Sequence, residues 1–572
     1  MYKLFLCFRY LTRKGIVVFP ILAVWLCVLM LIVVTSIMTG FVNRVRTAGR
    51  GLMGDVVIDS QSMAGFPYYR QLQRKLSQLP QVLASTPVIT AYGLLNLPEF
   101  GINGANTYVQ IMGIDPAGKS KVSDFGASLF WQHQAPREAL RDLGPLAFPV
   151  TTGWLVAQAQ RRLRAAIRRL RRRRTALLAL KPIPASAWFA YWRRHWQVIT
   201  REDYRQALYA LDRADRDLRF VESLDPHAVF PDRQALLDAL APTTPSFKPP
   251  PAAAARYPTA AAAEPKHGCI VGVDIGLYRR DRFGHYHRPA GVRFAPVILT
   301  VAPVTRRVTL ATPQSRRFMI VDDARTKVFT VDRRTVYAPF KVIQKMAFMQ
   351  RQELLTGGVR PARCNQIQVR LRDDATSGAV RAGRRAIAAL VRRFERRHPT
   401  MLMAGMQVRT WQQMQGEFIH AVDHERDLIV FLLGLMSLVV VIVIFLIFFM
   451  MVRDKTRDIG IIKAVGGSEF GVGVIFVLYG MLISAAGALL GMVSGVEFVR
   501  HDNWIHDHIL WRIFGISIWN RRYYIFSRIP DQVDPHAVAA IVSLAVAAGL
   551  IGALVPALIA AVQDPVEALR YE

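Results

Sequence analysis

The sequence predicts a membrane protein with four transmembrane α-helices and a large α+β extracytoplasmic domain between helices 1 and 2, which carries a helical-hairpin insertion. Three observations support this prediction. Four apolar segments exceed the roughly 20 residues that a helix needs to cross a bilayer. The long stretch between the first two alternates strand-like and helix-like patterns, and its middle part changes to basic helices. A hydrophobic content of 52% suits a few spans combined with a large water-exposed part.

The predicted spans are residues 16–40, 428–452, 470–497 and 537–562. The first is too long for the core of a signal peptide and no small-residue cleavage site follows it, so we predict an uncleaved anchor. Basic residues precede it and fill the 453–469 loop: Lys3, Arg9, Arg13, Lys14, Arg453, Lys455, Arg457 and Lys463. By the positive-inside rule this loop and both termini, residues 1–15 and 563–572, are cytoplasmic, and the 498–536 loop is extracytoplasmic.

The α+β domain is predicted in two parts, residues 41–126 and 267–427. Short β-branched runs predict strands at Asp55–Asp59, Val88–Leu97, Thr107–Ile114, Cys269–Ile275, Arg293–Ala302, Arg307–Thr312, Arg316–Val321, Ile367–Leu371 and Met406–Thr410. Apolar residues at helical spacing predict helices at Tyr68–Leu79, Phe340–Gln350 and Gly378–His398. Cys269 and Cys364 form at most one disulfide, or remain two buried thiols.

Residues 127–266 form the predicted insertion. Apolar residues on one face predict a helix over Thr152–Leu180 and a second over Arg201–Leu224, with the aromatic segment 188–196 as the bend of an antiparallel hairpin. A proline- and alanine-rich linker, residues 242–265, leads back to the main domain.

Nine of the fourteen residues 161–174 are arginine, within a chain of net charge +33. Two interpretations stay open: this run binds anionic phosphates, such as lipid head groups, or it is the solvated face of a helix in an arginine-rich chain. We expect no nucleic-acid partner, because the insertion is predicted to lie outside the membrane. A protein partner that docks on residues 127–266 is a further expectation.

We expect no catalytic site. The chain shows no nucleophile elbow, zinc-protease motif or paired CxxC, and we predict no phosphate loop and therefore no ATP hydrolysis by that route. The nearest approach to a metal constellation follows the third span: His501, Asp502, His506, Asp507 and His508. Its spacing matches no standard site, so we expect neither a metal nor any other cofactor on this chain.

Two features of the membrane part suggest contacts. Gly487, Gly491 and Gly495 recur every four residues in the third span, a spacing that lets helices approach closely, unless it reflects ordinary glycine content. The segment Arg453–Ser468 reads RDKTRDIGIIKAVGGS. Its 458–465 part suits a short helix ended by Gly466, which would serve either as a lipid-surface anchor or as a docking surface for a soluble partner.

The segment Arg453–Ser468 resembles the cytoplasmic loop of FtsX-like ABC permeases, although Asp458 stands where most relatives have glutamate. The C-terminal run, Pro556-Ala557 followed by DPVEALRYE at 564–572, is similar to the ending of the same family. The turn Gly113–Pro116 also matches the outer domains of the lipoprotein-releasing (LolC/LolE) and macrolide-exporter (MacB) branches. The insertion has no counterpart in the standard outer domain of the family.

This resemblance implies a multi-pass permease subunit of a bacterial inner membrane. It would pair with a second permease copy and with separate ATPase subunits, which hold the ATP and Mg²⁺. It would release or export lipoproteins or another hydrophobic substrate. The alternative is an FtsX-like mechanotransmitter that regulates a cell-wall hydrolase, and a third hypothesis is a membrane-anchored structural protein. The implied ATPase-coupling residues are Arg457, Asp458, Ile459, Gly460, Ile461, Lys463, Ala464 and Gly466.

Overall fold

The computed structural model describes residues 18–97, 105–179, 187–241, 244–248, 267–275, 279–280, 286–287, 296–303, 312–326, 328–353, 359–372, 377–399, 405–414, 416–454, 459, 461, 463–464, 466, 468–510, 529 and 531–562. They form two compact units. The helical unit comprises the described residues of Met1–Arg44, Glu417–Trp519 and Arg528–Glu572, and the sheet unit comprises those of Val45–Gly416.

Long apolar helices build the helical unit. They are α2 (Val18–Met53), whose residues from Val45 onward belong to the sheet unit, α16 (Gly416–Asp454), which begins at the last residue of the sheet unit, α18 (Glu469–Ile505) and α20 (Pro535–Val562). A π-helical turn, η4 (His506–Leu510), follows α18. In the described part of the chain, three stretches are long and apolar enough to cross a membrane: Val18–Asn43, Glu469–Ile505 and Pro535–Val562. The predicted second span lies within α16 and stays a prediction.

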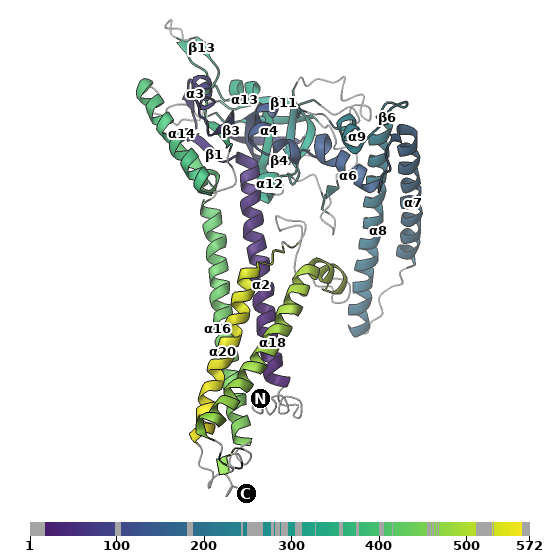
Figure 1. The fold of residues 1–572 in the computed structure, drawn as a ribbon. Helices are drawn as coiled ribbons and strands as arrows, with labels where there is room; N and C mark the ends of the chain where they lie inside the picture. The colour runs from purple at the N-terminus through teal and green to yellow at the C-terminus, as the bar shows by residue number, and fades with distance from the viewer. Residues whose placement is uncertain are drawn as a thin grey trace. The chain divides into compact units, whose positions relative to one another are not determined.

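A narrow apolar seam holds α2, α18 and α20 together, and α18 and α20 run side by side in Figure 1. Val24, Val28 and Ile32, each four residues apart on α2, are buried in the same cluster as Ile475, Tyr479 and Ile483, also four apart on α18. Residues four apart lie on one face of a helix. The seam is therefore a direct consequence of the spacing in the sequence.

The sheet unit contains one nine-stranded sheet, most of it curled into a ring. Six strands close this ring because β3 pairs back with β10. In order they are β10 (Pro296–Val301), β11 (Gln314–Ala324), β7 (Gly268–Gly272), β12 (Thr335–Pro339), β4 (Ala105–Ile114) and β3 (Val82–Leu97). β11 pairs with β7 and β12 with β4 in parallel, and the other pairs are antiparallel. Ring closure removes the exposed edges that an open sheet presents.

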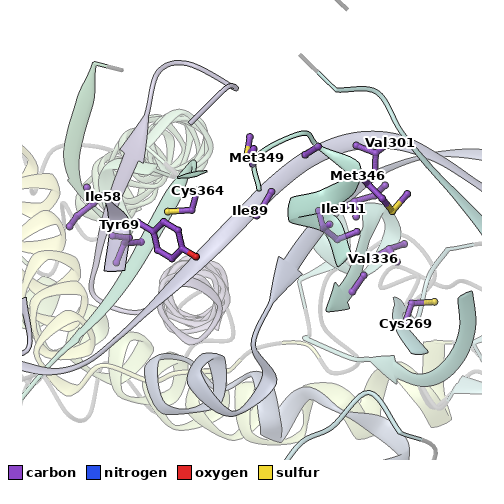
Figure 2. Close-up of a cluster of buried hydrophobic side chains, with 14 of the residues drawn as sticks. Ile58, Tyr69, Ile89, Ile111, Cys269, Val301, Val336, Met346, Met349 and Cys364 are labelled. Atoms are coloured by element: carbon purple, nitrogen blue, oxygen red, sulfur yellow. The ribbon is translucent and has the colours of Figure 1, made fainter. Parts of the chain in front are cut away.

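The first half of β3 leaves the ring and starts a flatter part of the sheet. There it pairs with β16 (Gln366–Leu371), which is followed by β1 (Val56–Ser60) and β17 (Met406–Thr410), all antiparallel. Helices α3 (Tyr69–Leu76), α13 (Phe340–Met346) and α14 (Ser377–Arg397) contribute to the same hydrophobic core. Figure 2 shows this core extending from Ile58 and Tyr69 across Ile89 and Ile111 to Val336.

Short elements complete the main part of the sheet unit. The helices are α4 (Pro116–Val122), α5 (Phe125–Ser128), α12 (Phe329–Arg334) and α15 (Trp411–Met414). The strands are β2 (Phe66–Pro67) with β15 (Arg363–Cys364), β8 (Arg279–Arg280) with β9 (Tyr286–His287), and β13 (Gln352–Glu353) with β14 (Val359–Arg360). Cys269 and Cys364 are both buried and not in a disulfide, and burial raises the pKa of Cys364.

The insertion folds around its own hydrophobic core. A π-helical turn, η2 (Phe130–Gln134), leads into α6 (Ala135–Asp142), and a two-residue strand pair, β5 (Val150–Thr151) and β6 (Val229–Phe230), closes the base. The hairpin consists of α7 (Thr152–Leu178) and α8 (Ala187–Glu222), which lie side by side in Figure 1, and α9 (Arg233–Leu240) follows. Their core includes Trp131, Leu155, Val221 and Leu236.

The structure corrects one feature of the predicted hairpin. The aromatic segment 188–196 is not the bend, because α8 begins at Ala187 and continues through it. Aromatic residues do not break helices, whereas Pro182 and Pro184 just before them do. Strand β12 was not predicted, and the predicted strand Arg307–Thr312 and linker 242–265 lie largely outside the described residues.

Candidate functional site

The segment between α16 and α18, which we call the tip (residues 455–468), carries the residues implied in coupling. Arg457, Asp458 and Gly460 lie outside the described residues. Ile459, Ile461, Lys463 and Ala464 have helical backbone, and Gly466 has φ +101°, a left-handed conformation that suits glycine at the end of a helix. The N–H of Gly466 donates to the carbonyl oxygen of Lys463 at 3.0 Å. Ser468 Oγ then accepts from the N–H of Gly471 at 3.1 Å and caps the N-terminus of α18.

One face of the tip packs against the helical unit. Ile459 is 2% exposed and lies in an apolar cluster with Val452 of α16, Val472 of α18 and Ala560 of α20. Lys463 Nζ donates to the carbonyl oxygen of Ala561 at 2.8 Å, near the C-terminal end of α20. A cation at this place satisfies a terminal carbonyl and the helix dipole. The same ammonium lies 3.5 Å from Glu469 at the start of α18.

The opposite face of the tip is exposed. Ile461 is 48% exposed, and Ala464 and Gly466 are also exposed. Ile459 and Lys463 are four residues apart, and Ile461 and Ala464 three apart, so the two pairs occupy opposite faces of a helix. The tip is thus attached to three helices by one face and presents a small apolar surface with the other.

The three glycines of α18 lie against α2. A Cβ on Gly487 would lie 2.8 Å from the Cβ of Val24, and one on Gly491 would lie 2.7 Å from the Cβ of Val28. For Gly495 the nearest atoms, on Ile32, are at 3.3 Å. Alongside them, Trp25 Nε1 donates to Ser494 Oγ at 2.8 Å. Glycine at these positions allows an approach of the two backbones that a larger residue would obstruct.

The letters of the phosphate-loop pattern, G-x-x-x-x-G-K-S, do occur in this chain, at Gly113–Ser120, so the expected absence of this motif is wrong at the level of the sequence. In the structure this segment has no open loop. Gly113 belongs to β4, only Asp115 separates β4 from α4, and the Asp115 carboxylate accepts from the N–H of Gly118 at 3.1 Å. A phosphate loop needs backbone N–H groups that are free to surround phosphate.

Lys119, the lysine of this pattern, is 2% exposed and points into the sheet unit. Its Nζ donates to the carbonyl oxygen of Leu52 at 2.6 Å and to the side-chain oxygen of Gln368. Leu52 lies in the last turn of α2, so the ammonium caps the C-terminal end of this helix. Burial lowers the pKa of Lys119 to about 7.

Buried carboxylates of β11 hold the insertion on the sheet. Asp322 accepts from the backbone N–H groups of Trp131 and Gln132 at 2.8 and 3.0 Å, and Asp323 accepts from the Trp131 indole at 2.9 Å. Burial is the main reason that the pKa of Asp322 rises to about 7. Sequence reasoning missed these residues, and the signal that was available is the Asp-Asp pair inside an apolar strand.

The polar segment after the third span is divided between α18 and η4. His501 Nδ1 lies 3.1 Å from the carbonyl oxygen of Glu497, and the ring of His508 stacks on Trp504. Asp502 is buried and accepts from Asn503. Among the described residues, no group of three histidine, cysteine or acidic side chains is arranged to hold a metal ion.

Known proteins resemble part of this chain. No family model matches it. The chain is 29% identical over 168 residues to the lipoprotein-releasing system transmembrane protein LolC of Neisseria meningitidis. It is 30% identical over 168 residues to LolC of Xylella fastidiosa, and 24% identical over 172 residues to LolE of Haemophilus influenzae. Each match covers 29% or 30% of this chain, and the chain spans about 40% of the length of these relatives. They confirm the predicted resemblance to the LolC/LolE branch.

Proposed function

We propose that this chain is the permease subunit of an ATP-driven complex in a bacterial inner membrane, and that the complex releases lipoproteins or a related hydrophobic substrate. The relatives named as lipoprotein-releasing transmembrane proteins and the three apolar helices support this proposal. A separate ATPase subunit would hold ATP and Mg²⁺, and a second permease copy would complete the membrane part. This chain would transmit motion rather than catalyse hydrolysis.

The two-faced tip is the observation that carries the proposal. Its exposed face, with Ile461 and Ala464, would dock on the ATPase. Its buried face would pass on the movement, because Ile459 packs among α16, α18 and α20 and Lys463 bonds to the end of α20. Arg457, Asp458, Gly460 and Gly466 would complete the docking segment.

Replacement of Ile461 by glutamate tests this role. A charge on the exposed apolar face would prevent burial against a partner, since an unpaired buried charge is strongly unfavourable. We expect ATPase stimulation in the reconstituted complex to fall at least about tenfold, which corresponds to about 1.4 kcal/mol. Membrane insertion and thermal stability should be unchanged, because the side chain is half exposed without the partner.

The matched control is Val359→Glu, which places the same charge on a residue of similar exposure (50%) in the sheet unit. This variant should retain full ATPase stimulation. If Ile461→Glu also retains it while the complex assembles, the exposed face of the tip is not the coupling surface. Purification that recovers no ATPase subunit would refute the transporter proposal as a whole.

A mechanotransmitter that regulates a cell-wall hydrolase is the second candidate. One observation favours it. The insertion has its own hydrophobic core and is held on β11 by buried hydrogen bonds from Trp131 to Asp322 and Asp323, so it is a folded module on which a partner can dock. In that case the purified complex would contain a hydrolase bound through residues 127–266, and lipoprotein release would be unaffected by loss of the chain.

A further inference from the structure

The nine arginines of α7 differ in their contacts. Arg162 pairs with Asp217 at 3.3 Å and lies 3.7 Å from Asp142, and Arg173 pairs with Asp203 at 3.1 Å, so these two help to hold the hairpin together. The seven others are all exposed, and five of these lie on one side of the helix, at successive intervals of three, four, three and one residue. We call them the arginine stripe: Arg161, Arg164, Arg168, Arg171 and Arg172.

The stripe lies on the side of α7 that faces away from the hairpin core. At 100° per residue its five members fall within an arc of about 100°. The residues that pack inward, Leu155, Ala159 and Leu163, lie on the other side of the helix. Among the described side chains, no acidic group lies within ion-pairing distance of a stripe arginine. The stripe is about 16 Å long, from the 1.5 Å rise per residue.

The two arms of the hairpin differ in charge. Residues 144–200, which include all of α7, contain 12 arginine and lysine residues and no aspartate or glutamate, whereas residues 201–222 of α8 contain six acidic residues and five arginines. The distal end is also rich in aromatic residues: Trp188, Phe189, Tyr191, Trp192 and Trp196. At the end of α7, Leu178 is 75% exposed.

This combination favours a lipid surface over an acidic protein. Tryptophan and tyrosine together with arginine are typical of segments at the membrane–water interface. An acidic protein would explain the stripe but not the aromatic residues and exposed leucine at the same end. We propose that the distal half of the hairpin docks on a phospholipid surface with anionic headgroups, with the arginine stripe on the phosphates.

Vesicle binding by the full chain tests the proposal. The chain is held in phosphatidylcholine nanodiscs and mixed with vesicles of phosphatidylcholine, with or without 30% phosphatidylglycerol as the probe composition. A fluorophore at Leu178→Cys reports the environment of the distal end of the hairpin. The unsubstituted chain gives the background from native cysteines. We expect the chain to float with the anionic vesicles only, and the emission of the fluorophore at position 178 to shift to the blue. Both effects should be lost at 0.5 M NaCl.

The decisive comparison uses two quintuple variants with the same change in charge. Glutamine at all five stripe positions should reduce binding at least about tenfold, because each basic residue near an anionic surface contributes about fivefold. The control carries Arg→Gln at five exposed positions of α14: Arg385, Arg392, Arg393, Arg396 and Arg397. It should bind like the parent, and thermal unfolding verifies that both variants are folded.

Three outcomes would overturn the proposal. Equal loss of binding in both variants would show that only net charge matters. An unchanged emission wavelength of the fluorophore at position 178 during vesicle binding would place the contact elsewhere. Binding of polyglutamate that depends on the stripe, without binding of anionic vesicles, would identify an acidic protein as the partner. None of these measurements involves ATPase activity, so they are independent of the proposed function.

Discussion

At the scale of single residues, burial decides what a charged side chain does. Lys119 belongs to a pattern that elsewhere binds phosphate, yet here it is buried and bonded to the end of α2. Asp322 and Asp323 lie in an apolar strand and hold the insertion through Trp131. Spacing along the sequence predicts none of these roles, because the partners are far away in the chain and only folding brings them near.

The buried lysine predicts a pH dependence of stability. The pKa of Lys119 is lowered from 10.5 to about 7, so between these values the unfolded chain binds a proton that the folded chain does not. Stability should therefore rise with pH from about 7 upwards, by up to about 1.4 kcal/mol per pH unit. Below pH 7 both states are protonated, so this increment is absent. Lys119→Met should remove the slope in thermal unfolding followed from pH 7 to 9.

Lys121→Met is the matched control for this prediction. Lys121 lies in the same helix and is exposed, so its replacement should leave the slope unchanged. A parent protein whose stability does not rise over this range, or a Lys119→Met variant that keeps the full slope, would contradict a neutral buried amine.

At the scale of elements, periodicity is the reliable signal. Met406–Thr410 coincides with β17, and most other predicted strands and helices are found within a few residues of their expected bounds. β12 was not predicted because it lacks the alternation of a half-exposed strand. It lies between β7 and β4, and four successive residues, Thr335–Ala338, are buried. The aromatic segment 188–196 was predicted as the bend because it lies between the two predicted helices, whereas α8 begins at Ala187 and includes it.

The packing of α18 on α2 predicts opposite effects of one substitution at two glycines. Gly491→Ala should destabilise the helical unit by about 1–3 kcal/mol, because the new methyl group would lie 2.7 Å from Val28. Gly434→Ala in α16 is the control, since nothing lies within 4 Å of its Cβ position. Alanine there should be neutral or stabilising by up to about 1 kcal/mol. Thermal unfolding in detergent measures both, and a stable Gly491→Ala variant would refute the close approach.

At the scale of the whole molecule, the chain divides into two units with separate cores. Among the residues that the structure describes, the hydrophobic clusters of the sheet unit and the α2–α18–α20 cluster share no member. A unit with its own core can fold without the rest of the chain. The insertion adds a second core within the sheet unit, which explains why this unit tolerates more than a hundred additional residues.

The sheet unit is therefore expected to fold by itself. A fragment of residues 45–416 should be soluble and unfold in a cooperative thermal transition followed by circular dichroism. A shorter fragment that ends at residue 405 lacks β17, which pairs with β1 along its whole length. Its transition should lie at least about 5 °C lower, because an edge strand and its backbone bonds are lost. A non-cooperative or insoluble longer fragment would show that the sheet unit depends on the helical unit.

The sequence by itself determined the membrane class, the α+β character of the long segment between the first two predicted spans, and the resemblance to the LolC/LolE branch. These features depend on local hydropathy, short-range periodicity and contiguous motifs. Tertiary structure decided the ring closure of β3 on β10, the buried role of Lys119, and the division of the tip into an attached and an exposed face. It also separated the paired arginines of α7 from the arginine stripe. Each of these depends on contacts between residues distant in sequence, which the order of residues alone does not display.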